Sequence, residues 1–353
     1  MSKIFVINVG STTTKVAYYV DRVCVVKANL EHDVRELLAF GDLMNQKDFR
    51  KQKIQDFMSE KNIQLNELDA ITSRGGHTHP IEGGVYRISP LMLEEISSGK
   101  FGRHACDVGP GIAFEMTQGE KSVPLVVDPP VTDEFGPLAR YSGHPLMPRR
   151  SKFHALNHKA TAKRYAKENG LNYGELRLVT VHMGGGTSIA AHQLGKITDA
   201  NNGIEGEGPF STNRTGGLTA QFLADLCFSG KYTPKEVAKM INGEGGLVAY
   251  LNESDARKCE DRAVGDPYAD EVMQAMIYQV AKEVGAYACV LDGNIDAILL
   301  TGGIANSKKL MDMLIEQIGF LGKVVLYPGE NEMEALAFGA DDGLNGVEPI
   351  KLI

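Results

Sequence analysis

The chain has 353 residues, which is enough for two domains of ordinary size, each with its own hydrophobic core. Hydrophobic residues make up 43% of the sequence and charged residues 23%, as in ordinary soluble globular proteins. A formal net charge of −8 argues against a nucleic-acid partner, because binding to a phosphate backbone requires a basic surface.

The sequence shows no sign of a targeting or membrane segment. It begins MSKIFVINVG, which already reads as a strand, and no apolar run approaches the roughly 18 residues that a spanning helix needs. The five cysteines are scattered and form no CxxC pair, a usage typical of thiols in a reducing compartment. We therefore expect a cytoplasmic protein with no membrane partner.

The chain opens on a strand, a short polar turn and a second strand. The apolar residues 4–7 lead into NVGSTTTKV at residues 8–16. A turn so rich in glycine and hydroxyl groups directs several N–H and O–H donors at one place, and such a concavity commonly holds phosphate. For Lys15, a lysine at a solvent-exposed strand edge is an open alternative. The candidate phosphate-binding residues here are Asn8, Ser11, Thr13 and Lys15.

The first half continues with a helical pattern over residues 34–58 and a strand over residues 69–73 that ends in an Arg-Gly-Gly turn. A short buried strand over residues 123–127 ends at Asp128, and the two prolines that follow fix the chain and project this side chain beyond the sheet. Ligand sites of α/β proteins form at the carboxyl ends of strands, so Asp128 is a candidate site residue. Three prolines exclude one regular element over residues 135–150, and we place the domain junction there.

The second half contains a similar series of elements. A helix is expected over residues 154–169, and a second hairpin begins at Leu178 with the turn HMGGGTS over residues 182–188. A glycine-rich loop over residues 203–217 follows. The remaining predicted elements are a helix over residues 270–291, strands over residues 295–300 and 323–327, and a helix over residues 333–340.

Two pairs of segments indicate that the halves are duplicated. When the two hairpins are aligned, Asn8 falls on His182. The pattern DAIxxxGG likewise occurs at residues 69–76 and again at residues 296–303. Self-similarity over so long a period indicates a duplicated unit, and the presence of only two copies excludes a solenoid. We expect two similar domains that face each other across a central cleft.

These motifs together resemble the superfamily of acetate and sugar kinases, actin and heat-shock chaperones, and within it the acetate kinase family. The likeness covers nearly the whole chain and is greatest to the members that phosphorylate butyrate and branched-chain fatty acids. Its most specific pieces, in chain order, are NVGSTTTK, SRGGHTHPIEGG, RRSKFHALNHK, VHMGGGTS, STNRTGG, ESDARKCED, LLTGGIANS and PGENEMEALAFGA.

The resemblance implies an α/β fold of two duplicated domains with mixed sheets flanked by helices, the ribonuclease H-like fold of the actin-like ATPases. The N-terminal domain, residues 1–147, is expected on the acyl-substrate side, and the C-terminal domain, residues 148–340, is expected to bind the nucleotide. A final helix over residues 341–353 is expected to pack back on the first domain. The family also implies a homodimer or higher homo-oligomer.

The implied reaction is reversible, in-line transfer of the ATP γ-phosphoryl group to butyrate or a branched short-chain fatty acid, which gives the acyl phosphate. A carboxylate is already ionised and nucleophilic at neutral pH. The barrier therefore comes from repulsion between two anions and from charge on the transferring group, which arginines and directed donors can offset. For each arginine alone, a surface side chain in a loop is the alternative. The implied catalytic residues are Arg74, Asp128, His154 and Arg214.

Some of these positions have competing interpretations. Asp133 is a rival for the role of Asp128, because the stretch after Asp128 departs from the family pattern. His154 and His158 are four residues apart on one helix face, which is also a zinc-pair spacing, but no HExxH glutamate and no clear third ligand accompany them. His158 is expected either to support the site or to be a structural histidine.

The resemblance implies Mg2+ as cofactor and ATP as co-substrate. Glu332 and Asp128 are the implied magnesium ligands, with Glu330 and Glu334 as rivals, because the family spacing requires a one-residue insertion here. No GxxxxGK[ST] motif occurs, so the P-loop class is excluded. The implied nucleotide- and phosphate-binding residues of the second half are His182, Gly184, Gly185, Gly186, Asp255, Arg257, Gly302, Gly303 and Asn306.

The implied acyl pocket contains Gly75, Gly76, Phe153 and Pro209. Acetate kinases carry valines after the arginine that matches Arg74, so the glycine pair here would leave room for a longer acyl tail. The alternative is that both glycines serve only backbone geometry. Competing functions are an acetate or propionate kinase, a sugar kinase of the same fold, and an actin-like or chaperone-like ATP-driven scaffold.

Overall fold

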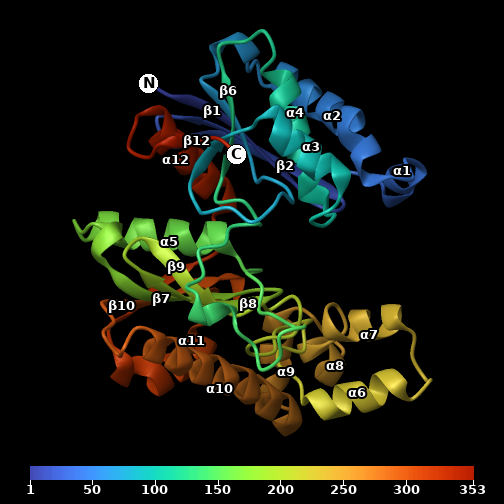
Figure 1. The fold of residues 1–353 in the computed structure, drawn as a ribbon, viewed down its shortest axis with the longest axis vertical. Helices are drawn as coiled ribbons and strands as arrows, with labels where there is room; N and C mark the ends of the chain where they lie inside the picture. Colours follow the sequence, from blue (N-terminus) through green and yellow to red (C-terminus); the bar gives the residue numbers. More distant parts are fainter. The chain divides into compact units, whose positions relative to one another are not determined.

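The computed structural model describes the whole chain, residues 1–353, and the chain divides into two compact units (Figure 1). Unit 1 comprises Met1–Asp133 together with Asn331–Ile353, and unit 2 comprises Glu134–Glu330. No helix in either unit combines the length and the apolar character that crossing a membrane would require.

Unit 1 is built on a seven-stranded mixed sheet of order β12-β5-β6-β4-β1-β2-β3. The first three strands form an antiparallel meander, whereas β4 and β6 continue the sheet in parallel with β1. The strands are β1 (Lys3–Val9), β2 (Thr13–Val20), β3 (Val23–Glu31), β4 (Ala70–Ser73), β5 (Val85–Arg87), β6 (Val123–Val127) and β12 (Ile350–Lys351).

Helices cover both faces of this sheet, which is why β1 reads as a continuous apolar run. Phe5, Ile7 and Val9 pack with residues of α2, α3 and α4, while α12 packs on β1, β4 and β6. A side chain at Gly339 would overlap Val127, so this glycine lets α12 approach the sheet closely. The helices of the unit are α1 (Val34–Ala39), α2 (Lys47–Glu60), α3 (Pro90–Ser98), α4 (Val108–Met116) and α12 (Glu332–Leu344), with 3-10 turns η1 (Leu43–Gln46), η2 (Leu65–Glu67) and η3 (Ala105–Asp107).

Unit 2 contains a five-stranded sheet of order β11-β10-β7-β8-β9. Its strands are β7 (Arg177–Met183), β8 (Thr187–Gln193), β9 (Lys196–Ala200), β10 (Ala297–Gly302) and β11 (Val324–Pro328). Helices α10 and α11 pack on one face, where Val179, Val181 and Leu300 belong to the largest apolar cluster. Helix α5 covers the other face through a smaller cluster that includes Tyr165, Leu178 and Leu299.

The remaining elements of unit 2 are helices and short 3-10 turns. The helices are α5 (Ala155–Glu168), α6 (Ala220–Phe228), α7 (Pro234–Ile241), α8 (Gly246–Leu251), α9 (Ala256–Ala263), α10 (Pro267–Val290) and α11 (Lys308–Ile318). The 3-10 turns are η4 (Leu138–Arg140), η5 (Tyr173–Glu175), η6 (Gly303–Asn306) and η7 (Gly319–Leu321).

The sheet topology confirms the duplicated α/β fold. In unit 1 the order β4-β1-β2-β3 is matched in unit 2 by β10-β7-β8-β9, with the same parallel and antiparallel pairings. Asn8 pairs across its hairpin with Lys15, and His182 pairs with Ser188. Each lies one residue before the end of its strand, so the alignment of Asn8 with His182 holds in three dimensions.

The unit boundaries differ from the domains expected from sequence. The expected junctions lay at 147/148 and 340/341, whereas the compact units change at 133/134 and 330/331. Residues 331–340 belong to unit 1 because α12 packs on the first sheet. Residues 134–147 belong to unit 2 because they bond to its strands, for example through the hydrogen bond from Gly136 N–H to the Thr198 carbonyl. The predicted final helix over residues 341–353 is wrong: α12 ends at Leu344, and Ile350–Lys351 form strand β12 beside β5.

The predicted helix over residues 34–58 is also divided. The structure has α1, the turn η1 and then α2 in this range. Asp33 caps α1 and Asp42 caps η1 by accepting from the backbone N–H groups of Arg35 and Met44. Gly41, with a φ of +68°, lies between the two elements. A short polar capping residue before each element and a glycine in the left-handed conformation between them thus divide a segment that hydrophobic periodicity alone predicts as one helix.

Candidate active site

The first candidate phosphate turn lies between β1 and β2 and is closed by the hydrogen bond from Gly10 N–H to the Thr13 carbonyl, at 2.9 Å. Ser11 and Lys15 are exposed and Thr13 is half-buried, so the turn presents donors at the surface of unit 1. The structure therefore places Ser11, Thr13 and Lys15 in one turn and the strand after it, with Lys15 exposed on β2, which is an interior strand of the sheet.

A buried arginine holds this turn from behind. Arg50 on α2 is 0% exposed and donates to the carbonyl oxygens of Ser11, at 3.0 Å, and Thr13, at 2.9 Å. It also donates to Thr14 Oγ1 and Gln46 Oε1. Burial lowers the pKa of Arg50 to about 10. All its hydrogen-bond acceptors are uncharged, so the arginine organises the turn while keeping its positive charge there uncompensated.

Three predicted site residues converge at the start of α12. The Asn8 side-chain amide donates to Glu332 Oε2 at 2.8 Å, and Arg74 Nη1 lies 3.2 Å from Glu332 Oε1. Glu332 is the first residue of α12. Asn8 lies one residue before the end of β1, and Arg74 directly follows β4. The rival Glu334 lies in the same first helical turn. Unit 1 thus contains a carboxylate placed between an amide and a guanidinium.

Backbone conformation constrains Gly75, and packing constrains both glycines of the pair after Arg74. Gly75 has a φ of +88°, and a Cβ there would lie 2.7 Å from Pro129 Cβ. A Cβ at Gly76 would lie 2.9 Å from Ile96 Cδ1 and 3.0 Å from the Asp107 carboxylate. These contacts support the structural interpretation of both glycines, so their role in an acyl pocket stays a prediction that rests on the resemblance.

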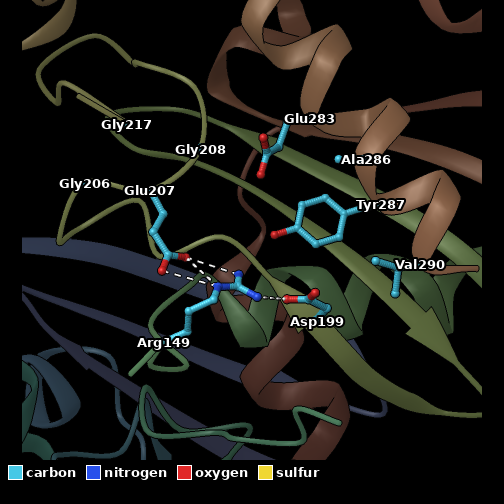
Figure 2. Close-up of a pocket in the computed structure, with 10 residues that line it drawn as sticks. All are labelled: Arg149, Asp199, Gly206, Glu207, Gly208, Gly217, Glu283, Ala286, Tyr287 and Val290. Carbon is cyan, nitrogen blue, oxygen red and sulfur yellow. Dashed lines mark hydrogen bonds and ion pairs between the residues drawn. The ribbon is translucent and has the colours of Figure 1, made fainter. Parts of the chain in front are cut away.

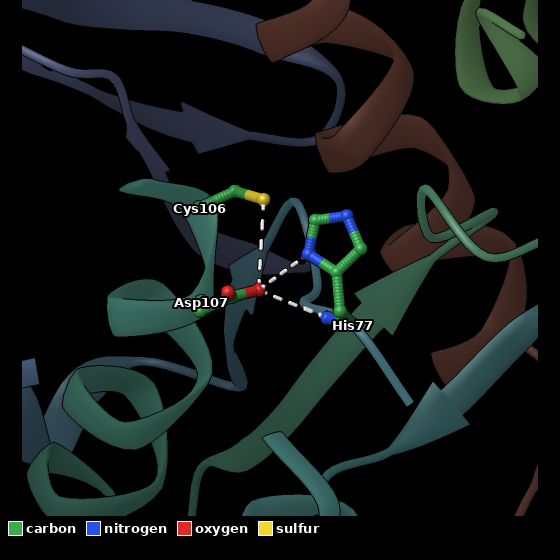
Figure 3. Close-up of side chains that lie close together, drawn as sticks. All are labelled: His77, Cys106 and Asp107. Carbon is green, nitrogen blue, oxygen red and sulfur yellow. Dashed lines mark hydrogen bonds and ion pairs between the residues drawn. The ribbon is translucent and has the colours of Figure 1, made fainter. Parts of the chain in front are cut away.

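Asp107 anchors the segment after this glycine pair (Figure 3). Its carboxylate accepts from the backbone N–H and Nδ1 of His77, both at 2.9 Å, and from the backbone N–H of His104 at 2.7 Å. Possible metal-ligand atoms of His77, Cys106 and Asp107 lie within 4.8 Å of one another. Burial raises the pKa of the Cys106 thiol to about 12, so it stays protonated at neutral pH. The hydrogen bonds to Asp107 account for this cluster as a loop anchor.

Asp128 lies directly after β6 in an unusual conformation. It is 3% exposed with a φ of +40°, a value that non-glycine residues rarely adopt. One carboxylate oxygen accepts from Gly84 N–H at 2.7 Å, and its own N–H donates to the Gly84 carbonyl at 2.9 Å. Strained backbone of this kind concentrates at functional sites, and here it accompanies a buried carboxylate bonded to Gly84. Asp133, the rival, bonds through its N–H to the Ile81 carbonyl.

In unit 2 two histidines stack at the start of α5. The rings of His154 and His182 lie 3.9 Å apart between centroids, with an interplanar angle of 18°. His182 is 2% exposed, and its Nδ1 lies 2.8 Å from Asn157 Oδ1. Its Nε2 is buried without a hydrogen-bond partner, 3.6 Å from the carboxylate of Glu330. An orphaned buried nitrogen suits a ligand that supplies the missing partner.

Arg214 packs against the second phosphate turn. A side chain at Gly186 would overlap the Arg214 guanidinium, so the glycine turn permits this close approach. Gly184 N–H donates to the Gly186 carbonyl at 3.0 Å and closes the turn that includes Gly185. Arg214 pairs with no carboxylate, and its Nε is buried without a partner. Burial lowers the pKa of Arg214. This guanidinium is therefore a cation whose environment lacks an anion.

The loop that carries Arg214 is fastened by Arg149 (Figure 2). Arg149 Nη1 lies 2.8 Å from Asp199 on β9, and Nη2 lies 3.2 Å from Glu207 on the loop. Arg149 also donates to the carbonyl oxygens of Ala139 and Ala200. These groups border a cavity of about 450 Å³, whose other lining residues include Glu283 and Tyr287 of α10.

The remaining predicted residues occupy separate parts of unit 2. Asp255 caps α9 and pairs with the exposed Arg257 at 3.2 Å. Gly302 has a φ of +91° at the end of β10, and a side chain there would overlap the Met183 backbone. Gly303 begins the turn η6, in which the Asn306 amide donates to the Gly303 carbonyl at 2.9 Å.

Phe153 and Pro209, predicted for the acyl pocket, are both in unit 2. Phe153 stacks on Phe135 with centroids 6.2 Å apart, and Pro209 is buried before Phe210. Gly75 and Gly76 belong to unit 1. The structure of either unit alone therefore does not assemble the four predicted pocket residues.

Comparison with known proteins identifies the family. A model described as the Acetokinase family matches residues 137–339. Butyrate kinase 2 of Clostridium acetobutylicum is 44% identical over 350 residues, which cover 99% of this chain and 98% of that protein. A probable butyrate kinase of Clostridium botulinum is 43% identical over 352 residues, 99% of each chain. The chain belongs to the acetokinase family.

Solved structures show the same fold. Acetate kinase of Porphyromonas gingivalis superposes with a TM-score of 0.78 at 19% identity, over 97% of this chain and 99% of that chain. A propionate kinase from Francisella tularensis gives a TM-score of 0.76 at 19% identity, over 96% and 99%. As an acetokinase the chain is a kinase that phosphorylates a carboxylate, and ATP is its co-substrate.

Two residues that shape this acetokinase site were not found from the sequence. Arg50 lies in a helix rich in charges, where nothing in the local pattern marks it as buried. Arg149 stands in the RRSKFH motif, but the motif does not show which arginine turns inward. A signal that could have found Arg149 is the pair of acidic residues that require a partner, Asp199 before the glycine-rich loop and Glu207 within it.

We expect Arg50→Met to loosen the first phosphate turn. The substitution keeps much of the side-chain length but leaves the Ser11 and Thr13 carbonyls without their charged donor. Loss of such buried hydrogen bonds should lower the free energy of unfolding by about 2–4 kcal/mol and raise the KM for ATP. Urea unfolding and initial-rate kinetics measure the two effects.

The exposed Lys53 on the same helix provides the control, since Lys53→Met also removes a cation. It should change the unfolding free energy by less than about 0.5 kcal/mol. If Arg50→Met and Lys53→Met were equally mild, the turn would not depend on Arg50.

Proposed function

We propose that this acetokinase phosphorylates butyrate or a branched short-chain fatty acid to its acyl phosphate, reversibly and by direct in-line transfer. The observation that carries the proposal is Arg214, a largely buried guanidinium with no carboxylate partner beside a glycine turn. The choice of acid is supported by relatives named as butyrate kinases that are 43–44% identical over nearly the whole chain.

The chemistry assigns a charge-handling role to each unit. The acceptor carboxylate needs no general base, because it is ionised at neutral pH. Arg74 would bind that carboxylate through its planar fork, while Arg214 and His154 would offset charge on the transferring phosphoryl group. Asp128 would organise the site from the end of β6. The turns after β1 and β7 would bind phosphate oxygens, and Gly302, Gly303, Asn306, Asp255 and Arg257 would bind the nucleoside.

The residues around Glu332 fit magnesium. Mg2+ prefers oxygen ligands and binds through one or two carboxylates together with substrate phosphates. Glu332 is partly buried beside the phosphate turn that begins after Asn8, and Asp128 is a second carboxylate of the same unit. When bound, the ion would neutralise charge on the phosphate oxygens. In unit 2, Glu330 lies near His182 and Gly184, which makes it the stronger of the two rivals.

The acyl pocket would be formed by Gly75, Gly76, Phe153 and Pro209, although the packing of both glycines means that they do not alone set its size. Acetate or propionate kinase activity is the second candidate, because the structural neighbours carry those names. A homodimeric or larger assembly and a cytoplasmic location are proposed from the family likeness alone.

The function is tested by trapping the acyl phosphate with hydroxylamine. Enzyme, MgATP and hydroxylamine are incubated with butyrate, isobutyrate, acetate or glucose, and the acyl hydroxamate and ADP are measured. Two additional methylenes, each worth roughly tenfold or more in discrimination, favour butyrate over acetate by at least about 100-fold in kcat/KM. Preference for acetate would make the chain an acetate kinase, and ADP release with glucose alone would make it a sugar kinase.

Arg214→Ala should lower kcat at least about 100-fold, comparable to the loss of one preorganised donor in a transition state. Arg214→Lys should restore only part of the rate, because a point charge lacks the planar fork. The surface arginine Arg164, paired with Glu168 in the same unit, provides the control Arg164→Ala. Near-normal turnover by Arg214→Ala would remove this arginine from the mechanism.

Glu332→Gln should raise the magnesium concentration needed for half-maximal rate by at least about tenfold, since even neighbours of metal ligands often contribute that much. Asn8 and Arg74 contact different oxygens of Glu332, so glutamine retains an acceptor for only one of them, but it removes the charge with little change in side-chain size. Glu330→Gln and Glu334→Gln are the comparators. A titration of rate against magnesium in which Glu330→Gln has the larger effect would move the ligand by two residues.

A further inference from the structure

A continuous line of hydrogen bonds leads from Tyr173 to His154 inside unit 2. It passes from η5 through β8 and β7 to the buried side of α5. The links are Tyr173 Oη to His192 Nδ1 at 2.8 Å, His192 Nε2 to Thr180 Oγ1 at 2.8 Å, Thr180 Oγ1 to His158 Nδ1, His158 Nε2 to Ser188 Oγ at 2.8 Å, and Ser188 Oγ to His154 Nδ1 at 2.8 Å. We refer to these six side chains as the relay.

The inner members of the relay are sealed from water. His158, Thr180 and His192 are 0% exposed, and Ser188 is 1% exposed. Burial lowers the pKa of His192 to about 3 and the pKa of His158 well below its usual value. Lys159 acts in the same direction on His192, and His182 and His192 do so on His158. Both inner imidazoles are therefore neutral under ordinary conditions.

Neutral rings restrict the relay to two hydrogen-bond directions. A neutral imidazole has one N–H donor and one bare acceptor nitrogen, and a hydroxyl has one proton to donate. Thr180 Oγ1 contacts only the two histidine rings His158 and His192, and Ser188 Oγ contacts only His158 and His154. A hydroxyl that accepted from both of its rings would leave its own proton without an acceptor, so every buried N–H and O–H of the relay is satisfied only when all the donors point the same way along the line.

The direction decides where the proton of His154 lies. If Tyr173 donates to His192 Nδ1, then each following donor points toward α5, Ser188 donates to His154 Nδ1, and the neutral His154 ring carries its proton on Nε2. If the direction is reversed, His154 Nδ1–H donates to Ser188 and Nε2 is bare. A phenol donates a hydrogen bond more readily than it accepts one, which favours the direction that begins at Tyr173.

We propose that the relay, set by the Tyr173 hydroxyl, fixes neutral His154 as the Nε2–H tautomer, the form that can donate to a phosphoryl oxygen without first gaining a proton. Tyr173, His192 and Thr180 are then positioning residues that act through His158 and Ser188. The catalytic benefit rests on the proposed function of His154, whereas the tautomer itself is a property of the free protein.

The direct test is the tautomer state of the histidines. In protein labelled with 15N-histidine, the imidazole nitrogen shifts distinguish an N–H from a bare nitrogen, and single His→Gln variants assign the signals. We expect His154, His158 and His192 of the free protein to be Nε2–H tautomers. Observation of His154 as an Nδ1–H tautomer would overturn the proposal, whether or not the enzyme proves to use butyrate.

Tyr173→Phe tests control from the far end of the relay. The partly exposed ring is kept, and only the hydroxyl that selects the direction is lost. We expect His154 to become a mixture of tautomers and kcat to fall about twofold with both KM values unchanged, because only half of the molecules then hold the donor. A His154 signal that stays wholly Nε2–H would show that Tyr173 does not set the direction, and would overturn the proposal.

Tyr327→Phe is the matched control. Tyr327 packs in the same apolar cluster as Tyr173, but its hydroxyl donates to Glu168 at 2.8 Å and lies outside the relay. Its loss should leave the three tautomers unchanged. Ser188→Ala provides a second variant at the near end, where His154 should again lose its single tautomer. If Ser188→Ala left it intact, the link to the relay would have no effect on His154.

Discussion

The site depends on keeping positive charge available for anions inside a protein whose net charge is negative. A guanidinium that forms an ion pair with a carboxylate is already neutralised, whereas one bonded to neutral groups still attracts phosphate. Arg214 has no acidic partner, and Arg50 donates only to carbonyl, hydroxyl and amide oxygens. Arg74 differs, because Glu332 pairs with it at 3.2 Å. In the proposed function, Glu332 would instead hold magnesium, and Arg74 would be available to the substrate carboxylate.

Holding unpaired cations in place requires tightly packed supports. Gly186 lets the Arg214 guanidinium lie directly against the second phosphate turn, where any side chain would displace it. Arg149 then fixes the loop through Glu207 and Asp199, and here the carboxylates are useful because this arginine has a structural role. The two arginines thus differ by their partners: Arg149 is paired with two acids and fastens the loop, whereas Arg214 has no acidic partner, as its proposed role requires.

The extent to which the sequence predicted this arrangement follows from the range of each interaction. The duplicated hairpins and the strand that ends before Asp128 are local patterns, and the structure has them where the motifs placed them, whereas β10 ends at Gly302, two residues beyond the predicted end. Helix α12 belongs to unit 1 because it packs on strands that lie over two hundred residues earlier in the chain. Hydrophobic periodicity carries no information about such long-range contacts. The burial of Arg50 has the same origin. Two copies of one sequence motif can also have different packing requirements, as the tight packing around Gly76 shows.

The duplicated hairpin also explains why the two stacked histidines differ. His182 Nδ1 faces Asn157 Oδ1, an acceptor, so a neutral His182 ring carries its proton there and leaves Nε2 bare. His154 Nδ1 faces the Ser188 hydroxyl, which can itself donate, so a neutral His154 can carry its proton on Nε2. Because the rings stack at 3.9 Å, charging both would place two cations in contact. A neutral His154 ring that is already a donor avoids that repulsion.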